Sequence, residues 1–61
     1  MRRITIRNNG QNWVATFHDD AEVKRLFGTD TIPTPFLART SGRDVLREVQ
    51  ALNPDCEVVL A

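Results

Sequence analysis

The chain has 61 residues, and its 8 basic residues balance 8 acidic ones, so the formal net charge is zero. No apolar run approaches the roughly 18 residues of a membrane span, and one cysteine with one histidine falls short of the about four ligands of a structural zinc site. A lone cysteine cannot form an internal disulfide, which favours a reducing, cytoplasmic location. We expect a single domain over residues 1–61, with no metal, no cofactor and no membrane partner.

A chain of this length has little room for a core. A domain of about 60 residues buries only about 60% of the surface of its unfolded chain. Association with another chain is one way for so small a fold to gain buried area. Self-association is therefore among the properties that the length suggests.

Residues 3–7 and 12–18 alternate apolar and polar side chains, which is the period of half-buried strands. Between them lie Asn9 and Gly10. Both residue types tolerate positive φ, and this dipeptide is a strong hairpin signal. The pattern predicts an antiparallel hairpin.

Residues 21–27 follow Asp20, a good N-cap residue, and precede Gly28, which suits the left-handed position after a helix. Their apolar residues have the i, i+3, i+4 spacing of one helical face. The pattern predicts a helix of about two turns, which is too short to be stable without packing.

Residues 29–35 contain Pro33 and Pro35, and each proline pushes the residue before it toward extended geometry. We expect an irregular, stiff loop here. One interpretation is a binding loop, in which the hydroxyls of Thr31 and Thr34 meet a partner. The other is a strap over the sheet edge, with its apolar residues in the core.

Residues 36–40 are the third predicted strand and residues 56–60 the fourth. Between them, residues 42–52 carry one apolar stripe and follow Ser41, a candidate N-cap. Pro54 stops this helix. Because a strand–helix–strand crossover in one sheet is right-handed, the third and fourth strands should run parallel.

The expected element order is β-β-α-β-α-β. It gives a two-layer α+β domain with a four-stranded mixed sheet, strand order 3-2-1-4, and both helices on one face. The helix-covered face should then hold Ile4, Ile6, Trp13, Ala15, Phe17, Phe36, Ala38, Cys56, Val58 and Leu60.

This arrangement of the hairpin, with its apolar residues from Ile4 to Phe17, and of the helix from Val45 to Leu52 resembles the HicB-like half of the ribonuclease H fold. Small bacterial antitoxin domains of that type bind a toxin partner and lack catalysis, so the resemblance implies a non-enzymatic binding role. Two features depart from the family pattern: the insertion at residues 21–35, and the absence of the DNA-binding tail that commonly follows. The stretch from Leu26 to Phe36 also resembles small uncharacterised bacterial single-domain proteins, which implies no activity.

Catalytic chemistry has few candidates. Asp19 and Asp20 beside His18 could suggest acid/base work, but they also fit a helix cap at a strand end, and no second cluster completes a site. Cys56 could be a nucleophile, but a free cysteine in an apolar strand is usually a small core residue. The three glycines are scattered and form no phosphate-binding motif. We predict no enzyme and no catalytic residue.

The sheet face away from the helices is the most informative feature. Polar and basic side chains share it with three aliphatic ones, and the residues are Arg3, Thr5, Arg7, Val14, Thr16, Leu37, Arg39, Glu57 and Val59. One interpretation is an ordinary solvated face. A second is a protein or dimer interface with an apolar strip formed by Val14, Leu37 and Val59. A third is a nucleic-acid surface, although three arginines would neutralise only about three phosphates.

We therefore expect a small interaction module that binds another protein or itself, in an antitoxin-like or regulatory role. The alternative is a nucleic-acid-binding accessory protein that uses the basic outer sheet face. The expected partner-binding residues are Arg3, Arg7, Val14, Leu37, Arg39 and Val59 on the sheet face, with Thr31 and Thr34 in the loop.

Overall fold

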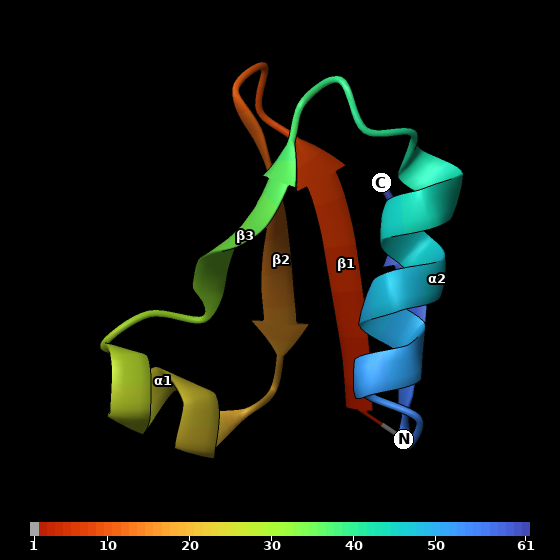
Figure 1. Cartoon of the computed structure of the whole chain (residues 1–61). Helices are drawn as coiled ribbons and strands as arrows, with labels where there is room; N and C mark the ends of the chain where they lie inside the picture. The colour runs from red at the N-terminus through yellow and green to blue at the C-terminus, as the bar shows by residue number, and fades with distance from the viewer. Residues whose placement is uncertain (1) are drawn as a thin grey trace.

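Four strands and two helices make up the chain in a computed structural model that describes residues 2–61. In chain order they are β1 (Arg2–Asn8), β2 (Asn12–His18), α1 (Ala21–Phe27), β3 (Thr31–Leu37), α2 (Gly42–Leu52) and β4 (Cys56–Leu60). The strands form one sheet in the order β3-β2-β1-β4 (Figure 1). β2 runs antiparallel to both β1 and β3, and β4 runs parallel to β1. The predicted α+β class, mixed sheet and strand order are confirmed.

The hairpin of β1 and β2 forms where the turn signal places it. The Asn8 side chain accepts the N–H of Gly10 at 2.8 Å, and the Asn9 side chain accepts the N–H groups of Gln11 and Asn12 at 2.9 and 2.8 Å. Gly10 has a φ of +93°, a conformation that disfavours any side chain. The two asparagines therefore satisfy the turn's backbone donors while glycine allows its tight geometry.

The third strand begins five residues before the predicted one and ends three residues before it. β3 spans Thr31–Leu37, so the prediction of an irregular loop over 29–35 is wrong for residues 31–35, and the predicted strand 36–40 ends at Leu37. β3 is an edge strand, and proline is tolerated there because one row of N–H groups has no partner strand. The pairing with β2 shifts register between Asn12 and Val14, which is typical of a bulge at a sheet edge.

α2 supplies most of the helix layer. It begins after Ser41, whose Oγ accepts the N–H of Asp44 at 3.2 Å, as the capping pattern predicts. Val45 and Val49 are buried against the apolar side of the hairpin and β4, and α2 lies along β1 and β4 (Figure 1). The core contains Ile4, Ile6, Trp13, Ala15, Val45, Val49, Cys56 and Val58.

Trp13 confirms the face assignment. Its side chain is only 9% exposed, and its Nε1 donates to the carbonyl of Thr40 at 2.9 Å. A buried indole with a partner for its N–H fixes the turn before α2 against the hairpin.

α1 is capped at both ends but buries little. The Asp20 side chain accepts the N–H of Val23 at 3.1 Å, and the N–H of Gly28 donates to the carbonyl of Lys24 at 2.8 Å. No residue of α1 is buried. The helix lies beyond the end of β2, away from α2 (Figure 1), so it closes one end of the sheet without covering the sheet's breadth.

Candidate interaction surfaces

The outer sheet face is polar, and many of its side chains bond to one another. Arg3 Nε donates to Glu57 Oε1 at 3.0 Å between adjacent strands. Thr5 Oγ1 lies 2.8 Å from His18 Nε2. A polar face whose groups already pair has little unsatisfied hydrogen-bonding capacity to offer a partner.

The three predicted arginines do not share this face. Arg39 lies in the turn after β3 and not on a strand, because β3 ends earlier than predicted. Arg3 is in an ion pair with Glu57, and Arg7 is exposed. The expected basic surface is thus reduced to two arginines, one of them paired, which is a weak basis for phosphate binding.

The predicted apolar strip is also broken. Val14 is on this face but only 8% exposed, between its cross-strand neighbours Arg7 and Pro33. Leu37 is 46% exposed on β3, whereas Val59 is half-buried on β4, at the opposite edge of the sheet. With strands about 4.8 Å apart, these edges are about 14 Å from each other, so the three aliphatic residues do not form one continuous patch.

The two threonines expected in a binding loop have structural roles in β3. Thr31 Oγ1 lies 3.1 Å from Thr16 Oγ1 on the neighbouring strand. Thr34 Oγ1 donates to the carbonyl of Trp13 at 2.6 Å and accepts the N–H of Phe36 at 3.2 Å. These hydroxyls stabilise the edge strand.

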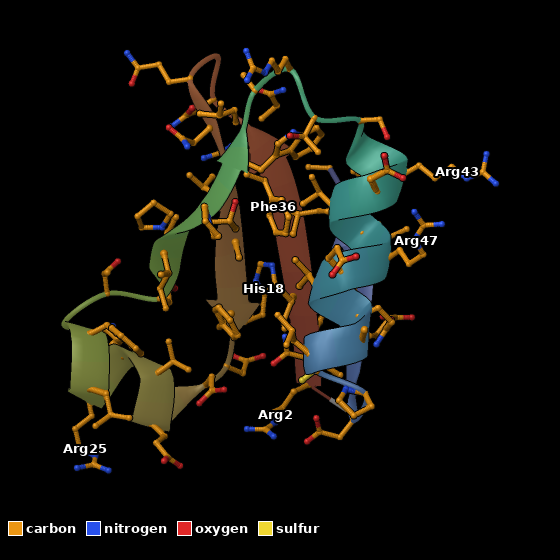
Figure 2. All side chains as sticks on the ribbon, viewed as in Figure 1. Arg2, His18, Arg25, Phe36, Arg43 and Arg47 are labelled. Carbon is orange, nitrogen blue, oxygen red and sulfur yellow. The ribbon has the colours of Figure 1, made fainter. Side chains whose placement is uncertain are left out.

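A different surface is apolar and open: a groove of about 230 Å³ on the helix side of the sheet, between α2 and β3. Figure 2 shows Phe36 at this position, between the ribbons of β3 and α2. We call it the α2–β3 groove. Its lining is almost entirely carbon and comes from Ala15, Phe17, Ile32, Pro33, Thr34, Pro35, Phe36, Val49, Leu52 and Asn53.

The groove exists because the helix layer is narrower than the sheet. A helix is about 10 Å across, and four strands about 4.8 Å apart need about twice that width to be covered. α2 covers β1 and β4, and α1 lies beyond the end of β2 (Figure 1). The helix-facing side of β3 and the Phe17 end of β2 are therefore covered only in part. Phe17, Ile32 and Phe36 are half-buried there, whereas Trp13 and Ala15 of β2 are buried.

Three large apolar side chains on the helices are exposed, and one of them, Leu52, lines this groove. Leu52 at the end of α2 is 77% exposed, and Leu26 and Phe27 on α1 are 62% and 61% exposed. The sequence patterns assigned all three to helix faces that pack on a core, so they were missed as surface residues. The signal available in the sequence was the shortness of the first helix, which cannot cover two strands.

Both sheet edges resist pairing with another strand. On β3, Pro33 and Pro35 have no N–H, and the N–H of Thr31 donates to Thr29 Oγ1 at 3.2 Å. On β4, the Gln50 side chain donates to the carbonyl of Cys56 at 2.8 Å and accepts the N–H of Val58 at 3.4 Å. Blocked edges are a common defence against strand addition, so a partner would bind through side chains.

The remaining polar cluster is an ion-pair network. Arg2 donates to Asp55 at 2.7 Å and to Asp20 at 3.3 Å. The hydrogen bond from Arg2 lowers the pKa of the Asp55 carboxyl, and Asp55 in turn raises the pKa of Arg2. Both Asp55 and Arg2 are solvent-exposed, so their pair is of the weak surface kind. Asp20 also acts as the predicted N-cap.

Other chemistry is sparse in the part of the chain that the structure describes. Residues 2–61 hold no group of three or more His, Cys, Asp or Glu side chains placed to bind a metal ion, and no helix long and apolar enough to cross a membrane. Cys56 is a buried core residue, as expected, with its thiol 3.7 Å from Asp55.

Models of known protein families, curated protein sequences and solved structures give no match to this chain.

Proposed function

We propose that the chain is a small non-enzymatic module that binds another protein or a second copy of itself through the helix side of its sheet. The observation that supports this is the α2–β3 groove, with exposed Leu52 beside it and Leu26 and Phe27 on the neighbouring helix. Contiguous apolar surface on a small water-exposed domain commonly marks a protein contact. The HicB-like resemblance stays a prediction, because it rests on element order and a fold does not determine function.

The size of the groove favours side chains over a small molecule. Pockets for drug-sized ligands have volumes of about 300–1,000 Å³ and hold a few convergent polar groups. This groove is smaller, at about 230 Å³, and offers almost no polar atoms. An apolar cavity of about 150 Å³ holds a benzene ring, so the groove has room for one aromatic side chain and part of an adjacent side chain of the same partner.

A photo-crosslinking pair tests the proposal. The residue p-benzoylphenylalanine replaces Leu52 in one variant and Leu37, the exposed leucine of the outer sheet face, in its matched control. Irradiation in the native cell should give a protein adduct from position 52, of another chain or of a second copy, and none from position 37. No adduct from position 52, or nuclease-sensitive adducts from position 37, would contradict the proposal.

A further inference from the structure

α1 packs only lightly on its own chain: Val23 is half-buried, and no residue of the helix is buried. It has seven residues, and isolated helices shorter than about 12–15 residues are marginal in water. Its caps at Asp20 and Gly28 define its ends, yet Leu26 and Phe27 remain mostly exposed. A short helix with an exposed apolar face gains stability when that face is covered.

The α2–β3 groove is an apolar surface with no side chain filling it. It is apolar, open and large enough for an aromatic ring, whereas Phe27 of the same chain is exposed and does not line it. The chain therefore displays both an unfilled apolar groove and an unburied aromatic side chain. In a pair of chains, Phe27 of each copy could fill the groove of the other.

A basic residue beside Phe27 and an acidic residue beside Leu52 have opposite charges. Lys24 is three residues before Phe27 and shares its helix face, and Glu48 is four residues before Leu52 and shares the face that borders the groove. Across the described residues, neither Lys24 nor Glu48 makes a salt bridge. A helix seated with Phe27 in the groove can bring this basic residue to that acidic one.

The exposed area also suits a pair of chains. The chain exposes 4343 Å², against about 4,000 Å² for a typical monomer of its mass. A standard interface needs about 800 Å² from each partner, which is about a fifth of that surface. In a two-fold dimer each chain contributes both a helix and a groove, so the helix–groove contact occurs twice. A zero net charge puts no overall repulsion between copies.

We propose that the α2–β3 groove receives α1 of a second copy, with Phe27 in the groove and Lys24 against Glu48, in a reciprocal two-fold dimer. This inference rests on the proposed function and identifies its partner. The contact uses side chains, in keeping with the blocked edges of β3 and β4.

Sedimentation equilibrium on the full chain, from micromolar to millimolar concentration, tests the dimer. The wild type should dimerise, and Phe27→Ala and Leu52→Asp should each raise the dimer dissociation constant at least about tenfold, as truncation or charging of a buried anchor does. Leu37→Asp is the matched control and should change it less than about twofold. All three side chains are exposed, so circular dichroism should show an unchanged fold.

A charge swap tests the orientation. Lys24→Glu and Glu48→Lys should each weaken the dimer, and the double variant should recover most of the loss. A wild type that stays monomeric at millimolar concentration overturns the dimer, as does a dimer that Phe27→Ala and Leu52→Asp leave intact. A monomer whose position-52 crosslinks reach only a different protein overturns the dimer while the proposed function stands.

Discussion

Gly42 at the start of α2 provides the sharpest test of the packing. A glycine in a helix is commonly replaced by alanine with a gain of about 0.5–1 kcal/mol. Here a Cβ atom on Gly42 would lie 2.9 Å from Cη2 of Trp13 and 3.1 Å from Cδ2 of Leu60. The indole cannot retreat easily, because it is buried and its Nε1 is bonded to the carbonyl of Thr40.

Two opposing contributions set the expected magnitude. Overpacking a buried site costs about 1–3 kcal/mol, which exceeds the gain in helix propensity. We expect Gly42→Ala to lower the free energy of unfolding by about 1–2 kcal/mol, out of about 3–9 kcal/mol for a domain of this length. The urea midpoint should fall by about 1 M, measured by far-ultraviolet circular dichroism at one fixed protein concentration, since association would add to stability.

The same substitution in a Trp13→Phe variant tests whether contact with the indole causes the loss of stability. Trp13→Phe removes the outer ring that carries Cη2, so Gly42→Ala should there be neutral or stabilising by up to about 1 kcal/mol. The two substitutions should therefore couple by about 1–3 kcal/mol. A stabilising or neutral effect of Gly42→Ala with Trp13 present would refute the close contact between the helix start and the indole. Gly28→Ala is a useful comparison, because its Cβ would meet open space but its φ is +75°.

Three further outcomes follow from the contacts of β4 and its neighbours. Gln50→Leu should cost about 1–3 kcal/mol, because it removes the partners of two backbone groups of β4; thermal unfolding measures this, and an unchanged melting temperature would contradict it. The pKa of Asp55 is lowered by the hydrogen bond from Arg2, so the stabilising pair is present above the unfolded-state pKa of about 4 and is lost as the pH falls below it. Asp55→Asn should show a smaller loss of stability between pH 6 and pH 3 than the wild type, and equal losses would argue against the pair. Cys56 is buried, so its thiol should react with a disulfide reagent slowly in buffer and rapidly in denaturant; fast labelling of the native protein would show that the strand is open.

The sequence predicts most of this fold because its strongest signals are local. The Asn9–Gly10 turn, the capping serine of α2 and the glycine after α1 each set a boundary within a few residues. β3 is the exception, because two prolines usually argue against a strand. They are compatible with one only at an edge, and edge position depends on the pairing of the whole sheet.

The surface that carries the proposed function depends on that same global arrangement. Hydrophobic periodicity shows which side of a helix is apolar, and in that respect Leu26, Phe27 and Leu52 behave as the pattern predicts. It contains no information on whether a neighbouring element covers that side. In this chain α2 covers two strands and α1 lies past the end of a third, so residues with a core pattern become surface. For the outer sheet face, the sequence pattern places the residues correctly but does not show which of them are paired. Alternation puts Arg3, Thr5 and Val59 on this face. Across the strands, however, Arg3 forms an ion pair with Glu57 and Thr5 a hydrogen bond with His18, so the face offers less free charge than the pattern suggests. One long helix is too narrow to cover a four-stranded sheet, and a helix of two turns cannot cover the rest. A short helix with an apolar stripe beside such a sheet is therefore a signal for an interface.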